Sequence, residues 1–319
     1  MNEFIIIRKY LKSLSRKDPD ALNLSDDIYF NKKKNIGITV DTYVAGIHFI
    51  SPKNPDHFLK KILRASLSDL YAKGIKPKNY FLSLSLNKKI ITKLWLLKIK
   101  KILNYEQKKF QITLGGGDTI YSSKISITIC FIGFSKNKPV LRSGAKVNND
   151  IYLTGNIGDS FIGLNILKKK LNLKKFNNYF KKKYYEPVLP VEIQPYLKKI
   201  ATSSIDVSDG LGQDLRNICR ESKCGAVVNL SCLPLSKQTK NLIKFRKVKL
   251  EKIFSNGDDY QILFTSDCKN RAKIEKLSKK LNLKITMIGR ITNNSKVIFK
   301  YKDKKIKLSA TKMGYTHTF

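Results

Sequence analysis

The stretch Ile205-Asp206-Val207-Ser208-Asp209-Gly210-Leu211 sets the pattern of this chain, because an apolar strand passes through two aspartates and a glycine into a helix. The strand is predicted at residues 204–207 and the helix at residues 211–221. Ser208 or Asp209 could simply cap the helix. A helix N-terminus also binds phosphate, and an aspartate at the preceding strand end can hold the accompanying cation. The stretch alone leaves both interpretations open.

Aspartates recur at similar positions elsewhere, although acids are scarce in a chain with 63 Lys+Arg and 24 Asp+Glu. Several of the motifs follow apolar runs and end in glycine, serine or threonine. Carboxylates beside small residues suit hard cations, which prefer oxygen ligands. The sequence therefore predicts a Mg²⁺ site and phosphate chemistry. The other motifs are Ser25-Asp26-Asp27, Val40-Asp41-Thr42, Leu67-Ser68-Asp69-Leu70, Gly116-Gly117-Asp118-Thr119 and Asn256-Gly257-Asp258-Asp259-Tyr260.

The composition predicts a folded cytoplasmic protein. The 319 residues, 42% of them hydrophobic, are enough for one large or two ordinary domains with a real core. No apolar run approaches the ~18 residues needed to cross a bilayer. The five cysteines are odd in number and lack Cys-x-x-Cys spacing, so we expect reduced core thiols and no membrane partner.

The net charge of +39 invites a nucleic-acid interpretation. The excess is mostly lysine, however, and it is spread along the whole chain. Solvated helix faces with long lysine stems explain it more simply. We therefore expect attraction to polyanions to be unspecific and salt-dependent, with no specific nucleic-acid partner.

Strands and helices alternate along both halves, which favours an α/β (α+β) protein of two mixed domains. The polar segment 136–149 is the expected boundary, giving an N-terminal domain 1–138 and a C-terminal domain 139–319. The predicted helices are 2–14, 57–73, 91–103, 160–169, 191–200, 211–221 and 270–281. The predicted strands are 36–43, 81–86, 110–114, 125–134, 150–154, 204–207, 226–230, 260–265, 285–291 and 296–300.

Asp69 is the strongest single candidate. On a helical wheel it lies in the apolar arc with Phe58, Ile62 and Ala72. A buried carboxylate is unfavourable unless it is paired or bound to metal. Arg64 or a lysine could pair with it instead.

The remaining motifs are weaker when taken singly. The run Gly115-Gly116-Gly117 is typical of a tight turn and lacks the residues of a P-loop. The pair Asp26-Asp27 repels itself unless a cation bridges it. A lone histidine such as His48 is usually structural, and three histidines without triad or zinc spacing give little support to hydrolysis.

Taken in order, the motifs closely resemble the thiamine-monophosphate kinase family, of the superfamily that includes aminoimidazole ribonucleotide synthetase and selenophosphate synthetase. The resemblance covers nearly the whole chain. Its most specific parts are residues 41–49 (DTYVAGIHF), 67–74 (LSDLYAKG), 142–145 (RSGA), 153–160 (LTGNIGDS), 205–211 (IDVSDGL), 257–260 (GDDY) and 314–317 (GYTH).

The resemblance implies a homodimer whose N-terminal sheets pair into a barrel, with the nucleotide cleft between the two domains. It implies ATP and thiamine monophosphate as substrates and several Mg²⁺ ions as cofactors. The acceptor is a phosphate that is already mostly ionised, so no general base and no catalytic side chain are expected. Metal ligands are expected at Asp27, Thr39, Asp41, Asp69, Asp118, Asp206 and Asp209. ATP contacts are expected at Gly117, Asp118, Arg142 and Ser208, and substrate contacts at His48, Asp258 and Tyr315.

The chain departs from the family pattern at Ser25, where glycine is usual, and at Val40, where a hydroxyl residue is common. Asp258 stands in place of a glutamate, and Ile120-Tyr121 replaces Thr-Arg. Among related enzymes, aminoimidazole ribonucleotide synthetase is the nearest alternative and is disfavoured by residues 41–49. A selenophosphate synthetase needs an N-terminal reactive cysteine, and the first cysteine here is Cys130. A basic nucleic-acid-binding protein would not explain the clustered acids.

Overall fold

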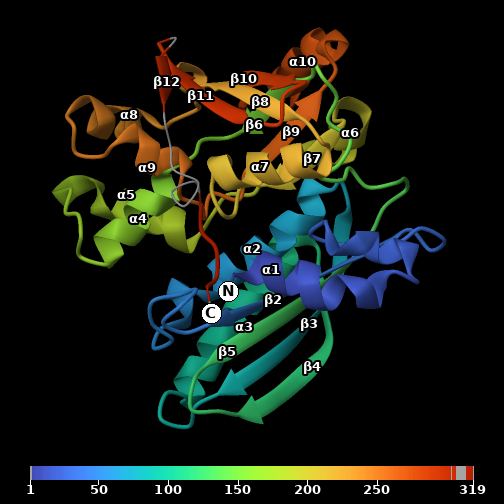
Figure 1. Ribbon diagram of the computed structural model, residues 1–319. Coiled ribbons are helices and arrows are strands. Elements are labelled where there is room, and N and C mark those ends of the chain that lie inside the picture. The colour runs from blue at the N-terminus through green and yellow to red at the C-terminus, as the bar shows by residue number, and fades with distance from the viewer. Residues whose placement is uncertain (1, 303, 307–313, 319) are drawn as a thin grey trace.

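Two separate sheets organise the chain, one within residues 29–134 and the other within residues 150–306 (Figure 1). The computed structural model describes residues 2–302, 304–306 and 314–318. The predicted α/β (α+β) class is confirmed, and the structure shows two sheets. The expected boundary near residue 138 falls in the connection between the sheets and remains a prediction.

The N-terminal sheet has five strands in the order β1-β2-β5-β3-β4. All neighbours are antiparallel except β3 and β4, which a helix connects and which run parallel. The strands of the described chain form no closed barrel. Their bounds are β1 Tyr29–Asn31, β2 Ile36–Val44, β3 Lys76–Leu86, β4 Thr113–Tyr121 and β5 Ser126–Phe134.

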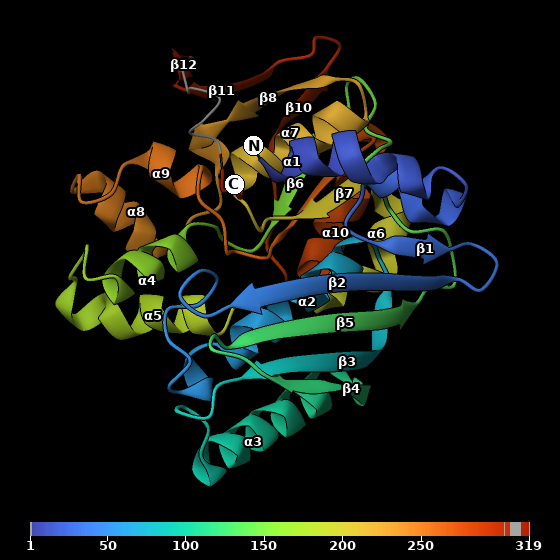
Figure 2. The same cartoon turned by 60° about the horizontal axis from the view of Figure 1, so that its bottom comes forward.

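Helices α2 (Leu59–Ala72) and α3 (Lys93–Phe110) cover one face of this sheet. The alternation along β5 buries Ile127, Ile129 and Phe131 against them. Figure 2 shows the opposite face in the foreground, with no helix in front of it. Large apolar side chains on this N-terminal sheet remain exposed, among them Val40 at 60% and Phe81 at 39%.

The C-terminal sheet has seven strands in the order β12-β11-β8-β10-β6-β9-β7. Helices α4 and α7 pack on one face through a large apolar cluster, and α6 and α10 pack on the other. Strands buried on both faces read as continuous apolar runs, as β6 and β9 do. The strands are β6 Asp150–Thr154, β7 Ser203–Asp206, β8 Gly225–Asn229, β9 Ile262–Ser266, β10 Ile285–Thr292, β11 Val297–Tyr301 and β12 Lys304–Ile306.

The remaining helices are short. None of the described helices is both long and apolar enough to cross a bilayer. The α-helices are α1 Glu3–Ile6, α4 Asp159–Leu167, α5 Asn177–Tyr185, α6 Gln194–Ile200, α7 Leu211–Glu221, α8 Lys237–Lys244, α9 Leu250–Phe254 and α10 Arg271–Leu281. A π-helix covers Ile7–Leu11, and 3₁₀ helices cover Lys12–Ser15, Pro19–Leu24, Pro55–His57, Lys174–Phe176, Val191–Ile193, Leu230–Cys232 and Cys268–Asn270.

Two predictions around the glycine run were wrong. Helix α3 continues to Phe110, because Glu106 and Phe110 extend its buried stripe beyond Leu103. The run Gly115–Gly117 is not a tight turn but lies inside β4, where the pairing shifts between Tyr80 and Phe81 of β3 to accommodate one extra glycine. A side chain at Gly117 would also clash with the backbone of Leu82.

A buried ion pair ties the first half of the chain together. Arg64 on α2 donates to both carboxylate oxygens of Glu106 on α3, at 2.8 and 2.7 Å, and to the carbonyl of Pro187 at 3.0 Å. The exposed fractions are 2% for Arg64 and 0% for Glu106. Arg64 is therefore the partner of Glu106 and not of Asp69.

Removing the charge of Glu106 leaves a buried guanidinium without its counter-ion. We expect Glu106→Gln to lower the free energy of unfolding by about 3–5 kcal/mol, measured by urea denaturation. Glu275→Gln is the control, because it breaks only the exposed pair with Lys279 and should change nothing measurable. Equal effects of the two substitutions would contradict this role of the buried pair.

Candidate metal and phosphate site

Helix α2 and strand β7 bring the predicted aspartates together between the two sheets. Asp69 on α2 accepts a hydrogen bond of 2.6 Å from the buried hydroxyl of Thr39 on β2. Asp206 ends β7 and accepts a hydrogen bond of 2.6 Å from Ser68, the neighbour of Asp69. Asp27 completes the group from the loop before β1.

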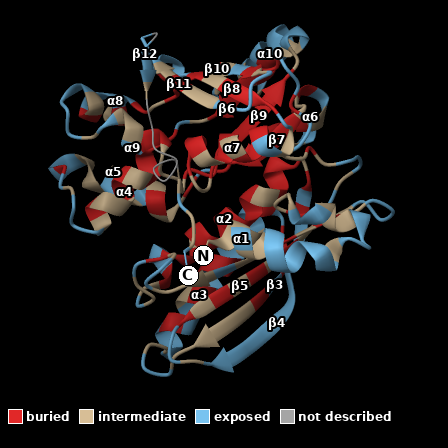
Figure 3. Ribbon diagram, viewed as in Figure 1, coloured by how far each residue is buried: buried red, intermediate tan, exposed pale blue. Residues whose placement is uncertain are grey.

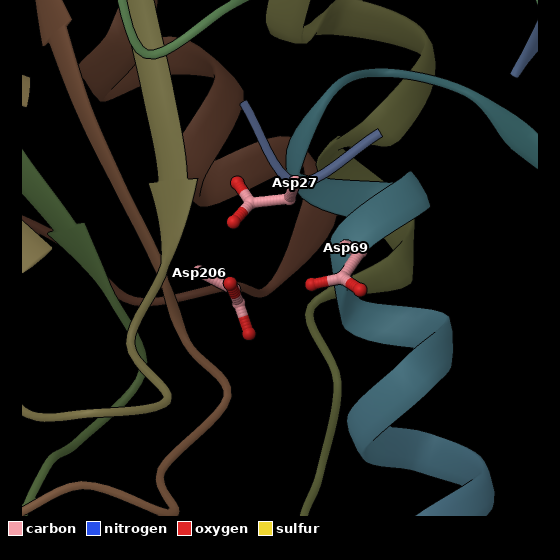
Figure 4. A group of neighbouring side chains, drawn as sticks. All are labelled: Asp27, Asp69 and Asp206. Carbon is pink, nitrogen blue, oxygen red and sulfur yellow. The ribbon is translucent and has the colours of Figure 1, made fainter. Parts of the chain in front are cut away.

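The carboxylates of Asp27, Asp69 and Asp206 each offer an oxygen within 4.8 Å of the other two (Figure 4). Figure 4 shows the three side chains entering one space from three separate segments. No ion pair is found for Asp69 or Asp206 among the described residues. Carboxylates so close together, Asp206 buried and the other two partly buried, favour a bound cation or a proton. This donor set, oxygen only, fits Mg²⁺.

Asp26 and Asp27 already have protein cations. Lys73 contacts both carboxylates, at 2.8 and 2.7 Å, and the guanidinium of Arg142 pairs with Asp27. The backbone N–H of Arg142 also donates to Asp26 at 2.7 Å. The uncompensated negative charge of the cluster therefore lies on the other aspartates.

The pKa values of the aspartates differ according to whether a protein cation lies beside them. Burial alone would raise the pKa of Asp27, but Arg142 and Lys73 outweigh it and lower the value to about 2. Burial, together with the charge of Asp27, raises the pKa of Asp206 to about 7. Burial and the charges of Asp41, Asp206 and Asp27 raise the pKa of Asp69 well above its ordinary value.

Asp41 and Asp209 flank this group. Burial raises the pKa of Asp41 despite hydrogen bonds from Ser66 and Tyr43. Burial, with the charges of Glu3 and Asp206, raises the pKa of Asp209 to about 7. A cation bound nearby would favour the ionised form of both carboxyl groups.

Asp214 was missed by the sequence analysis. It is buried on α7, and its carboxylate accepts hydrogen bonds from the backbone N–H groups of Asp209 and Gly210 at 3.2 and 3.1 Å. It therefore fixes the turn that carries Asp209. The sequence does contain a signal for Asp214, because this residue lies in the apolar stripe of helix α7 with Leu211 and Ile218. Asp69 was found by the same kind of signal on α2.

Gly117 and Asp118 lie apart from the cluster within one chain. Both are exposed on β4, and β5 and β3 separate β4 from β2, the strand of Asp41. Three strand spacings amount to about 14 Å. The side chain of Asp118 is therefore too short to reach the aspartate cluster of its own chain.

The three predicted substrate residues lie in one neighbourhood, connected by the C-terminal segment. His48 and His317 bring their Nε2 atoms to 3.4 Å, and the ring of Tyr315 packs edge-on against His317. The backbone N–H of Tyr315 donates to the carbonyl of Asp209 at 3.1 Å, which links this region to the metal group. Burial lowers the pKa of His48, and the nearby charge of Asp258 opposes this by raising it.

Asp258 is held by Lys61 at 2.8 Å and by the hydroxyl of Tyr260 at 2.8 Å. Its φ of 70° is a left-handed conformation that this turn imposes. The adjacent Gly257 leaves room for the carbonyl of Ser208, to which Asp258 donates its N–H at 2.9 Å. Ser208 and Asp258 thus belong to one packed turn beside Asp206.

A cavity of about 390 Å³ lies elsewhere, between the start of α4, the segment 187–192 and the end of α10. Asp159, Asp259 and Gln261 line it, but no predicted site residue does. Asp159 is already satisfied by hydroxyl groups, including those of Ser236 and Thr239. We therefore assign the chemistry to the aspartate cluster and not to this cavity.

Comparisons with known proteins show which family the chain resembles. The family model for the N-terminal domain of AIR synthase related proteins matches residues 20–135. Thiamine-monophosphate kinase of Buchnera aphidicola subsp. Schizaphis graminum is 36% identical, over 99% of this chain and 98% of the relative. The Escherichia coli K12 enzyme of the same name is 33% identical, over 91% and 90% of the two chains.

Solved structures give the same result for the fold. Thiamine-monophosphate kinase of Stenotrophomonas maltophilia K279a matches 95% of this chain and 96% of its own, with 26% identity and a TM-score of 0.77. A structure of AaThiL with AMPPCP and TMP shares the fold, with a TM-score of 0.83 and 24% identity over 99% and 97% of the chains. Since relatives above 30% identity match nearly the full length, the chain belongs to the thiamine-monophosphate kinase family.

Proposed function

We propose that the chain transfers the γ-phosphoryl group of ATP directly to thiamine monophosphate, giving thiamine diphosphate and ADP. Family membership supports the substrates. The single observation that carries the mechanism is the group Asp27, Asp69 and Asp206, in which each carboxylate offers an oxygen within 4.8 Å of the other two. Such a group suits divalent cations, and ATP-dependent transfer uses them.

We place Mg²⁺ on the carboxylates of Asp27, Asp41, Asp69, Asp206 and Asp209, with the hydroxyl of Thr39 beside Asp69. When bound, the ions supply charge neutralisation for two polyanionic reactants. The protein holds these oxygens in place through Ser68, Asp214 and the burial of α2. Because the acceptor phosphate is already mostly ionised at neutral pH, its second pKa being about 6, no side chain has to remove a proton.

The nucleotide side of the proposed site is formed by Arg142 and Ser208. Arg142 already lies against Asp27, so a phosphate bound there would lie next to the metal ligands. The substrate side is formed by His48, Asp258 and Tyr315, which lie in one neighbourhood beside Asp209. We add His317 to this group on its contacts with His48 and Tyr315.

We propose a homodimer in which the N-terminal sheets pair through their open faces into a barrel. The exposed apolar side chains of Val40 and Phe81 support this, since monomers rarely leave such a sheet face uncovered. Gly117 and Asp118 stay in the proposed site on the family resemblance alone. Because Asp118 cannot reach the metal group of its own chain, it can act only at a site shared with another subunit. The cytoplasmic location remains a prediction from the cysteines.

The function is tested with purified protein, ATP and thiamine monophosphate, following thiamine diphosphate by chromatography. We expect turnover with Mg²⁺, none in excess EDTA, and a loss of at least about 100-fold in kcat for Asp69→Asn, which removes a metal-ligand charge. The hydroxyl of Thr39 can still donate to the new amide oxygen, so circular dichroism should be unchanged. Asp56→Asn, exposed and outside the cluster, is the control. Wild-type turnover by Asp69→Asn would refute the metal assignment.

The raised pKa of Asp206 predicts a pH dependence of the metal-free protein. Between the ordinary value of 3.8 and about 7, the folded state binds more protons than the unfolded state. The stabilisation that comes from protonated Asp206 is complete below pH 4 and is lost as the pH rises through 7. In EDTA, urea denaturation should therefore show wild type losing stability relative to Asp206→Asn from pH 4.5 to pH 7.5. Parallel pH profiles for the two proteins would contradict the raised pKa.

The dimer is tested by light scattering on a sizing column. Phe81→Glu places a charge on the open face of the N-terminal sheet and should convert a dimeric mass to that of a monomer. Leu14→Glu is the control, because Leu14 is 80% exposed and lies outside this sheet. A dimeric mass for Phe81→Glu, or a monomeric mass for wild type, would show that this face is not the interface.

A further inference from the structure

Lys73 places a positive charge within the aspartate cluster. It follows the last residue of α2, and its side chain is 0% exposed. Its Nζ lies 2.8 Å from Asp26 Oδ1, 2.7 Å from Asp27 Oδ2 and 2.8 Å from the carbonyl oxygen of Ser204. An ammonium group has three N–H donors, so the protein provides a partner for each one.

The choice of partners is specific. Lys73 lies one helical turn after Asp69, the spacing at which an ion pair on one helix would form. It nevertheless contacts Asp26 and Asp27, and no ion pair between Lys73 and Asp69 is found. The ammonium therefore bridges one pair of carboxylates and leaves Asp69 uncompensated.

The third contact connects the two halves of the chain. Ser204 lies on β7, two residues before Asp206. Through Lys73, the loop that carries Asp27 is fastened to the strand that carries Asp206. The position of Asp27 relative to Asp206 thus depends directly on this side chain.

Arg142 also pairs with Asp27, but its side chain is 17% exposed and it is proposed to bind the nucleotide. Lys73 is fully enclosed and touches no part of the proposed nucleotide or substrate surface other than the loop of Asp27. Of these two cations, Lys73 is the one built permanently into the cluster.

We infer that Lys73 is a resident cation and a positioning residue of the metal site. It bridges Asp26 and Asp27, orients Asp27 toward Asp69 and Asp206, and weakens the attraction of the Asp26-Asp27 pair for Mg²⁺ by neutralising part of its charge. This inference rests on the proposed metal site. The protein itself thus supplies one of the cations of the site, the ammonium of Lys73.

The test compares wild type with Lys73→Met, which keeps the length of the side chain and removes its charge. Without Lys73, Asp26 and Asp27 attract Mg²⁺ more strongly. We expect Lys73→Met to melt at a lower temperature in EDTA and to bind Mg²⁺ about tenfold or more tightly by calorimetry. The rise in Tm on adding Mg²⁺ should therefore exceed that of wild type. An equal or smaller rise would overturn the inference.

Lys61→Met is the matched control, since Lys61 is a buried lysine paired with Asp258 outside the metal group. It should lower Tm without changing the Mg²⁺ affinity. The double variant Lys73→Met/Asp26→Asn removes one charge of each sign and should return the Mg²⁺ response to the wild-type value. A double variant that behaves like Lys73→Met would contradict a charge-based role.

The outcomes separate this inference from the proposed function. A wild-type protein whose Tm and calorimetry do not respond to Mg²⁺ would contradict the metal site itself. A wild-type response that is unchanged in Lys73→Met would contradict only the role of Lys73. If Lys73→Met is unfolded in EDTA, Mg²⁺ must restore its circular dichroism spectrum, and failure to do so would also overturn the inference.

Discussion

Repulsion among the clustered carboxylates of Asp27, Asp69 and Asp206 governs how charges are arranged between the two sheets. Helix α2 lies at the centre of it, between the two sheets. It contributes Asp69 to the aspartate group and Ser68 to Asp206, and Lys73, which directly follows the helix, pairs with Asp26 and Asp27. Its other buried charges, Arg64 and Lys61, have carboxylate partners of their own. One helix thus satisfies several charges with protein partners and leaves Asp69 for a cation.

The chain is basic overall and yet contains an acidic site, because its lysines and its clustered aspartates lie in different parts of the structure. Most lysines of the described residues are exposed, in helices, strands and loops alike, where water screens them. The aspartates lie where burial strengthens their field. The net charge of +39 favours the approach of anionic reactants such as ATP.

Much of the fold followed from the sequence because local patterns were strong. Strand β6 and helix α7 begin and end where they were predicted, since apolar periodicity and glycine punctuation bound both. Asp69 was found by its place in an apolar arc. The bulge of β4 at Gly115 was not predictable, because glycine serves turns and bulges equally. The role of Lys73 depends on contacts with distant segments, which periodicity does not report.

The central claim is that Asp27, Asp69 and Asp206 hold a divalent ion. The most direct test is anomalous diffraction from crystals grown with Mn²⁺ and a non-hydrolysable ATP analogue. We expect an anomalous peak within about 2.3 Å of carboxylate oxygens of these three residues. A structure with bound nucleotide and no anomalous peak among the three carboxylates would contradict it.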